Sequence, residues 1–178
     1  MVDGMTSVKL RCSCGSVLGS VDFSRPSRVH VVCHCGDCKA YARHIGNPRA
    51  NEVVQATPAQ VQILIGKEYL RCLRLTERGL TRWFAGCCRT PLANTSRHAW
   101  MPFIGVMSCV LDTDNEALLG TPTPANGGQA ISWSTIFRSV RALLLGLLFR
   151  RHRPNVFFND RGHPVALPEV LASPLREK

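Results

Sequence analysis

The residues best suited to chemistry are cysteines that lie close together in the sequence. The chain has nine cysteines, and seven of them fall into three short clusters: Cys12 with Cys14; Cys33, Cys35 and Cys38; and Cys87 with Cys88. In a reducing compartment, dense cysteines favour metal binding or catalysis over disulfide crosslinks. Zinc prefers four protein ligands in a structural site and three in a catalytic site, where one position stays open. Seven cysteines therefore predict one closed zinc site and one open site.

Cys33, Cys35 and Cys38, here called the trio, are expected to form the open site because they are a local group with no evident fourth partner. Cys33 and Cys35 would share one face of a strand, since side chains two residues apart point the same way. Gly36 and Asp37 are turn formers and are expected to bring Cys38 back to the same point.

Cys12, Cys14, Cys87 and Cys88, here called the quartet, are expected to form the closed site. Cys12 and Cys14 would share a strand face and borrow the remaining ligands from the second pair, so that metal binding is coupled to folding. A redox disulfide switch is the alternative interpretation of the clusters. Cys72 and Cys109 stand alone in apolar surroundings and are expected to be core residues.

Zinc on the trio would take a substrate thiol or a water as its fourth ligand, and coordination removes the proton of a thiol. Because three thiolates leave the site negatively charged, they favour delivery of a bound thiolate over polarisation of a carbonyl group. Arg43 follows the trio closely and is the candidate for binding the carboxylates of a glutathione-like molecule; the alternative is an arginine that only meets water at the surface. His44 is a candidate proton carrier, whereas His34 is expected to point away from the metal.

The elements that must position these residues are mostly short strands. They are predicted over residues 7–12, 28–33, 62–66, 69–76 and 80–85, with one or two more over 100–112. Residues 121–128 predict a linker, and one helix is predicted over about 135–152, capped by Ser134 and followed by Pro154. The fold class is therefore mostly β, with a zinc-binding β domain over 1–120 and a linker, helix and tail over 121–178 that pack on the same domain.

The predicted helix carries an apolar face and several arginines. The apolar face consists of residues at helical spacing: Ile136, Val140, Leu143, Leu144 and Leu147. We expect this face to pack on the β core while the arginines meet water. The alternative is a helix that binds a membrane surface or a partner.

Composition limits the classes of function. With 45% hydrophobic and 19% charged residues, the chain is typical of a globular protein. The first residues contain no apolar stretch of signal-peptide length, and no apolar run reaches the length of a membrane span, so a cytoplasmic location is expected. A net charge of +10 is consistent with an acidic partner or a small anionic ligand, and equally with a basic surface that only meets water. Nucleic acid is disfavoured, since no basic motif interleaved with aromatic residues is present.

The three cysteine clusters resemble the superfamily of glutathione-dependent formaldehyde-activating enzymes and centromere protein V. Its cysteine elements correspond here to CSCG at residues 12–15, CHCGDCKA at 33–40 and FAGCCRTPL at 84–92. The resemblance covers about residues 7–117, and CHCGDC is its most specific part. The third element departs from the pattern, because Ala85 stands at its first cysteine position and Arg89 at its glycine position.

The resemblance implies that Cys12, Cys14 and Cys88 are structural zinc ligands, with Cys87 interpreted as the fourth. It also implies a β-tent zinc fold and, in some members, carbon–sulfur bond chemistry. The segment after about residue 118 resembles an extension in an uncharacterised branch of the superfamily. We therefore expect a zinc-dependent carbon–sulfur lyase or thiol-adduct enzyme that acts on a small thiol or a glutathione adduct. The alternative is a non-enzymatic, zinc-stabilised binding module for an acidic partner.

Overall fold

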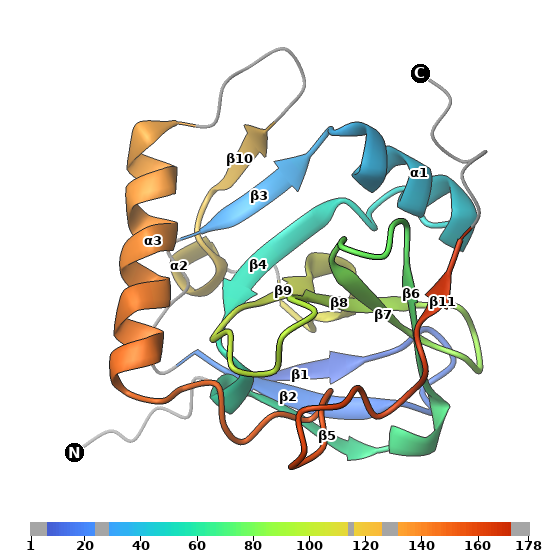
Figure 1. Ribbon diagram of the computed structural model, residues 1–178. Coiled ribbons are helices and arrows are strands. Elements are labelled where there is room, and N and C mark those ends of the chain that lie inside the picture. The colour runs from blue at the N-terminus through green and yellow to red at the C-terminus, as the bar shows by residue number, and fades with distance from the viewer. Residues whose placement is uncertain (1–6, 24–28, 114–115, 126–131, 172–178) are drawn as a thin grey trace.

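Two β-sheets dominate the computed structural model (Figure 1), which describes residues 7–23, 29–113, 116–125 and 132–171. The smaller sheet has the strand order β1 (Ser7–Arg11), β2 (Leu18–Asp22) and β5 (Val61–Ile65). The larger sheet runs in the order β10 (Pro122–Ala125), β3 (His30–Cys33), β4 (Glu52–Ala56), β9 (Ile104–Met107), β8 (Pro91–Thr95), β7 (Thr81–Ala85), β6 (Leu70–Arg74) and β11 (Glu169–Val170). The mostly β class predicted from the sequence is confirmed.

The helices are fewer than the strands. They are α1 (Gly36–Ile45), the short α2 (Glu116–Leu119) and α3 (Trp133–Leu148), with 3-10 turns at Pro58–Gln60, Lys67–Tyr69 and Ser108–Val110. Among the described residues, no helix combines the length and apolar character needed to cross a membrane.

The centre of the larger sheet is buried on both faces. Every residue of β8 and β9 is buried, and β7 is buried except at Phe84. The Trp83 ring lies at the core of this region, 4.8 Å from the Phe157 ring and 6.1 Å from the Phe158 ring. The Trp83 indole N–H donates to Thr95 Oγ1 at 3.0 Å, which satisfies its one polar atom. The tail after α3 thus completes the core.

Several strands agree with the sequence-based expectations, and several elements do not. β1, β3, β5, β6 and β7 fall within or close to predicted strands, and β9 lies in the predicted 100–112 region. The sequence patterns do not predict β2, β4, β8 or α1. The expected linker at 121–128 is wrong in part, because residues 122–125 form β10 and pair in parallel with β3; residues 126–128 lie outside the described part.

α3 occurs near the expected place, but its start and its buried face differ. Its N-cap is Ser132, without a side-chain cap hydrogen bond, so the prediction that Ser134 caps the helix is wrong. Most of the predicted apolar face does not pack on the core: Ile136, Val140, Leu144 and Leu147 are exposed, and Leu143 is half-buried.

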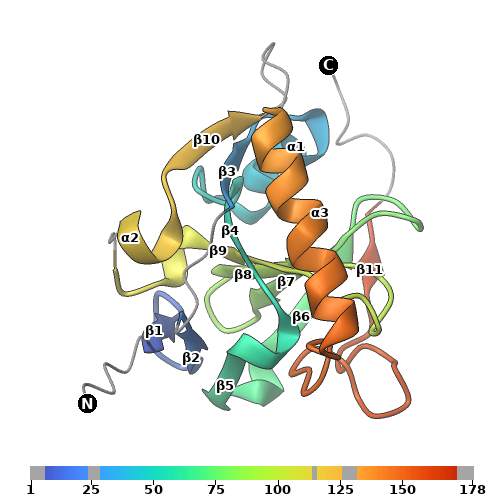
Figure 2. The same ribbon diagram turned by 90° about the vertical axis from the view of Figure 1, so that its left-hand side faces the viewer.

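The helix packs through small and hydroxyl residues instead. Thr135 and Gly146 are its buried residues, and Ser139 Oγ donates to Gln55 Oε1 at 3.0 Å. A Cβ atom at Gly146 would lie 2.7 Å from the Pro102 Cβ, so only glycine allows this close approach. Figure 2 shows α3 lying along the outside of the molecule, across the β3 and β4 side of the larger sheet.

Candidate metal centres

The trio lies where β3 ends and α1 begins. Cys33 is the last residue of β3, Cys35 is the N-cap of α1, and Cys38 lies in the first turn of the helix. The Cys33 and Cys35 Sγ atoms are 3.4 Å apart, and the three Sγ atoms all lie within 4.8 Å of one another. The chain returns Cys38 to this point as expected, and Gly36 and Asp37 do so as part of the first turn of α1.

The start of α1 provides a backbone hydrogen-bond donor to one of the sulfur atoms. The Cys35 side chain accepts from the backbone N–H of Cys38 at 3.4 Å, as an N-cap side chain does. The positive end of the helix dipole also lies here, and both effects stabilise thiolates. All three cysteines are half-buried, so the cluster is close to the surface.

A buried arginine accompanies the trio, and sequence reasoning missed it. Arg82 on β7 is only 4% exposed, and its Nη2 donates to Cys38 Sγ at 3.8 Å. Its guanidinium carbon lies 4.8 Å from the centroid of the Tyr41 ring. A hydrogen bond with Cys33, followed by burial, raises the pKa of the Cys38 thiol, and the Arg82 charge opposes this rise. An arginine inside the apolar strand sequence TRWFA was the signal that could have revealed it.

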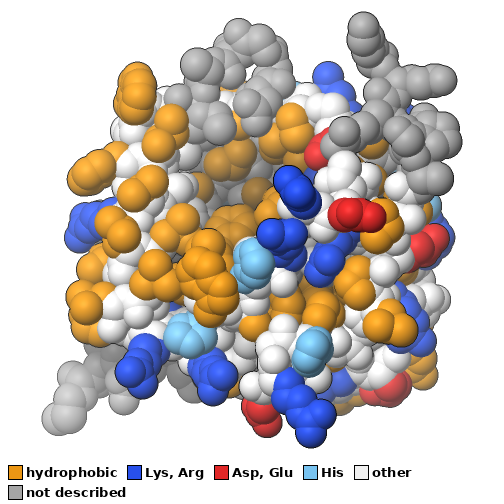
Figure 3. Space-filling view, in the orientation of Figure 1, with side chains coloured by type: hydrophobic (Ala, Val, Ile, Leu, Met, Phe, Trp, Pro, Cys, Tyr) orange, Lys and Arg blue, Asp and Glu red, His pale blue; other side chains and the backbone are white. Residues whose placement is uncertain are grey.

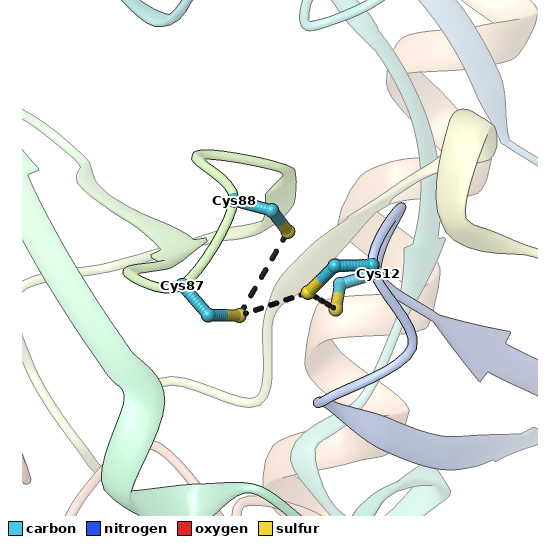
Figure 4. A group of neighbouring side chains, drawn as sticks. Cys12, Cys87 and Cys88 are labelled. Carbon is cyan, nitrogen blue, oxygen red and sulfur yellow. Dashed lines mark hydrogen bonds between the residues drawn. The ribbon is translucent and has the colours of Figure 1, made fainter.

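The quartet joins two turns that are distant in the sequence. Cys12 and Cys14 lie in the turn between β1 and β2, and not within a strand as expected; Cys87 and Cys88 lie in the turn between β7 and β8. Figure 4 shows Cys87 and Cys88 facing Cys12 across the gap between these turns. The Sγ–Sγ distances are 3.6 Å for Cys12 and Cys14, 3.4 Å for Cys14 and Cys87, and 3.8 Å for Cys87 and Cys88.

The turn between β7 and β8 explains how adjacent cysteines can face one point. The backbone N–H groups of Cys88 and Arg89 both donate to the Ala85 carbonyl, at 3.3 and 2.7 Å, and Arg89 has a positive φ of 56°. This tight turn directs both side chains to the same side. The Arg89 side chain then donates to the His44 carbonyl at 2.7 Å, which ties the turn to the end of α1.

Hydroxyl and amide groups surround the quartet and set the ionisation of its thiols. Burial opposes ionisation of Cys88, but hydrogen bonds from Ser13 and Thr90 lower the pKa of Cys88 to about 5. Hydrogen bonding with Ser16 lowers the pKa of Cys14. Burial, and then hydrogen bonds with Cys14 and Cys88, raise the pKa of Cys87 to about 12. The cluster thus favours some thiolates but cannot easily ionise all of them without a cation.

The sulfur geometry of both clusters fits a metal ion. None of the nine cysteines, all of which lie in the described part of the chain, forms a disulfide bond, and the Sγ–Sγ distances of 3.4 to 3.8 Å greatly exceed the length of such a bond. A tetrahedral site with Zn–S bonds of about 2.3 Å requires sulfur atoms about 3.8 Å apart. The quartet offers four such ligands and the trio offers three. Both clusters could therefore hold a metal ion.

Comparison with models of known protein families gives a match. Residues 5–121 match the model of a family of unknown function, DUF6151. The chain belongs to this family. The region that matches the DUF6151 model contains both cysteine clusters and ends before α3.

Comparison with solved structures shows a similar fold. The crystal structure of a Rhodobacter sphaeroides protein is similar with a TM-score of 0.50 and 22% identity, over 66% of this chain and 99% of that one. At this identity, the likeness concerns the fold alone. A search of curated proteins finds no match.

The remaining residues singled out in the sequence differ in burial and in their distance along the chain from the cysteine clusters. In this DUF6151 chain, Arg43 is exposed near the C-terminal end of α1, more than one helical turn beyond Cys38. His34 is half-buried between two members of the trio, and the half-buried His44 uses its carbonyl to anchor Arg89. Cys72 is 3% exposed and Cys109 is half-buried against the core, in keeping with the expected structural roles.

Proposed function

We propose that this protein binds two zinc ions, a structural one on the quartet and one on the trio, where carbon–sulfur bond chemistry on a small thiol or its adduct takes place. The observation that carries this proposal is the difference in ligand number between two clusters of similar sulfur spacing. Four ligands complete a tetrahedral structural site, whereas three leave one position for a substrate. Zinc bound to the trio would supply deprotonation and retention of a substrate thiol.

Arg82 supports the assignment of the trio as the reactive site. Three thiolates and a divalent cation carry one net negative charge, and the buried Arg82 guanidinium beside Cys38 balances it. Arg82 Nη1 is buried without a hydrogen-bond partner among the described residues. Because buried polar groups are normally paired, this donor suits an acceptor atom that a bound substrate provides.

The resemblance of the cysteine elements to the superfamily of formaldehyde-activating enzymes supports the proposed chemistry. That superfamily suggests a substrate such as a glutathione adduct of a small aldehyde. In this chain, the trio would hold the sulfur atom of the substrate. The alternative proposal is a binding module in which both ions only stabilise the fold, and it is consistent with the net charge of +10.

Metal content is the first test of the two-site proposal. We expect about two zinc ions per chain in protein purified without chelator, falling to about one in Cys35→Ser and to about one in Cys87→Ser. Cys109→Ala, a cysteine outside both clusters, is the matched control and should keep both ions. Elemental analysis of the four proteins measures this, and an unchanged zinc content in Cys35→Ser would contradict a metal on the trio.

Ligand exchange separates an open site from a purely structural one. In the cobalt-substituted protein, a small thiol should change the visible absorption bands if it binds at the trio. The change should be present in Cys87→Ser and absent in Cys35→Ser. Formation or breakdown of glutathione adducts of small aldehydes should then depend on Cys35 but not on Cys109. If the absorption bands do not change when a thiol is added, the binding-module alternative is favoured.

A further inference from the structure

The outward face of α3 is apolar along its whole length. Trp133, Phe137, Val140, Leu144 and Leu148 follow one another at intervals of three or four residues and so form one stripe. Their exposed fractions are 85%, 69%, 46%, 61% and 72%. The stripe lies opposite Thr135 and Gly146, which face the body of the protein. A helix that buries its small residues and exposes its large apolar ones is the reverse of the usual arrangement in a globular protein.

The apolar surface extends beyond the stripe. Ile136, Leu145 and Leu147 flank it and are 38%, 40% and 39% exposed. Figure 3 shows hydrophobic side chains gathered along the edge of the molecule where α3 runs. Single exposed apolar residues are ordinary, but a contiguous apolar surface of this kind marks an interaction site.

The charged residues of the segment that carries this surface all have one sign. Residues 132–153 contain no aspartate or glutamate, and they contain five arginines: Arg138, Arg141, Arg150, Arg151 and Arg153. Arg138 and Arg141 are exposed on the helix beside the stripe. An apolar stripe bordered by arginines is complementary to a surface that is apolar inside and negatively charged outside.

We propose that α3 docks the protein on a lipid bilayer that contains anionic lipid, with the helix parallel to the membrane plane. The helix has 16 residues and a length of about 24 Å, so it can lie in the interface but not span it. Trp133 begins the helix and Phe149 follows its end, and aromatic side chains prefer the level of the headgroups. The stripe would enter the boundary between headgroups and acyl chains, and the arginines would contact lipid phosphates.

A basic pocket at the C-terminal end of α3 adds to this complementarity. Arg97, Arg153 and Arg161 line an open pocket of about 470 Å³, together with one carboxylate, Asp160. Trp100, which is 54% exposed, lies at the same pocket. The excess of arginine provides a place where the phosphate of a lipid headgroup can bind next to the docked helix.

A second copy of the chain suits this surface less well. Two such helices packed through their stripes would bring Arg141 of each copy to the same interface, and residues 132–153 offer no acidic side chain to pair with it. The membrane proposal is independent of the chemistry proposed for the trio.

Vesicle flotation tests the proposal with the full chain. We expect binding to phosphatidylcholine vesicles that contain roughly a third phosphatidylglycerol, weaker binding to phosphatidylcholine alone, and a loss of affinity as salt rises. The double variant Phe137→Glu with Leu144→Glu should lower the affinity more than tenfold. Leu64→Glu, at a residue 67% exposed on β5, is the matched control and should bind as the unaltered chain does.

A second pair of variants tests how much the arginines contribute to vesicle binding. Arg141→Glu should weaken binding several-fold, whereas Arg78→Glu, at an exposed arginine in the turn before β7, should not. Zinc content and circular dichroism establish that each variant is folded.

Fluorescence of the unaltered helix provides a measurement that needs no change in α3. In Trp100→Phe, the remaining tryptophans are Trp83, which is fully buried, and Trp133, which is 85% exposed. Anionic vesicles should shift the emission to shorter wavelength as Trp133 enters the bilayer. The proposal is overturned if neither vesicle binds, if the double glutamate variant binds equally well, or if that variant only converts a dimer into a monomer.

Discussion

The quartet and the trio use the same ligand atom and similar sulfur spacings, yet they differ in how the chain builds them. The quartet joins the turn after β1 to the turn after β7, so its ligands come from positions more than 70 residues apart. The trio comes from one short segment at the start of α1, and a buried arginine lies beside it. The first arrangement ties distant parts of the fold together, and the second offers only three sulfur ligands, so a tetrahedral metal bound there would keep one position for another ligand. The comparison predicts that the quartet governs stability and the trio governs reactivity.

The largest expected effect is the loss of stability when the quartet is broken. Cys12→Ser should lower the free energy of unfolding by more than about 3 kcal/mol, since a structural zinc site contributes directly to folding. Cys33→Ser should cost clearly less, because the trio links only neighbouring residues. Chemical denaturation of both variants in the presence of zinc measures the difference.

Burial of Cys12 requires its own control. Cys12 is 1% exposed, so part of the loss could come from placing a hydroxyl in the core. Cys72 is 3% exposed and its thiol donates to the Ala166 carbonyl, which makes Cys72→Ser a matched change without a metal. We expect Cys72→Ser to cost about 1 kcal/mol. If Cys12→Ser and Cys72→Ser lower the free energy of unfolding equally, the quartet does not hold a structural metal.

The second effect is the dependence of the trio on Arg82. Arg82→Met keeps most of the side-chain volume but removes the charge beside Cys38, so zinc affinity at the trio should fall about tenfold, as it does for other groups that support metal ligands. Zinc at the quartet should be unaffected. Arg82→Lys should restore part of the affinity, which separates the effect of charge from that of packing.

A surface arginine provides the comparison for Arg82. Arg71 is exposed on the neighbouring strand β6, and Arg71→Met should change neither site. Competition with a chromophoric chelator, in a Cys87→Ser background that retains the trio, gives the affinity. If Arg82→Met and Arg71→Met behave alike, the buried charge is not part of the trio site.

The sequence identified the cysteines of each cluster but not the elements that hold them. The residue types of Gly36 and Asp37 predict a turn that follows a strand; in the fold, the same two residues begin α1, with Cys35 as its N-cap. Arg82 was missed because strand periodicity assigns one face to the core, whereas β7 is buried on nearly all sides. Only tertiary structure shows that an arginine in such a strand lies next to a distant cysteine.

α3 shows a different limit of sequence reasoning. The helical spacing of apolar residues predicts both ends of α3 to within a few residues, although it does not identify Ser132 as the N-cap. It could not show which face packs, because that depends on the shape of the surface beneath. The close approach of Gly146 to Pro102 selects the small residues for contact. The hydrophobic side chains are thereby left outside, and burial of the most apolar face was the wrong expectation.

The smallest expected effect is a difference in how the two sites respond to acid. Zinc binding requires thiolates, so protons compete with the metal at both sites as pH falls. The pKa of Cys38 is raised in the trio, chiefly by its hydrogen bond with Cys33, which strengthens this competition. In the quartet, hydrogen bonds lower the pKa values of Cys14 and Cys88, although that of Cys87 is raised, and a fourth ligand adds to the affinity. The trio should therefore release its zinc at a higher pH than the quartet.

Single-site variants make this difference measurable. Cys87→Ser retains the trio and Cys35→Ser retains the quartet, so the zinc released by each can be followed separately between about pH 8 and pH 5. The pH at which half of the zinc is released should be about one unit higher for the trio than for the quartet. The reason is that Cys38 holds its proton more tightly, and the trio has only three protein ligands with which to retain the metal. A substrate thiol that occupies the fourth position should move the midpoint of the trio toward that of the quartet and leave the quartet unchanged. Coincident midpoints that do not respond to thiol would mean that the two clusters are equally closed, and the division between a stabilising site and a reactive one would fail.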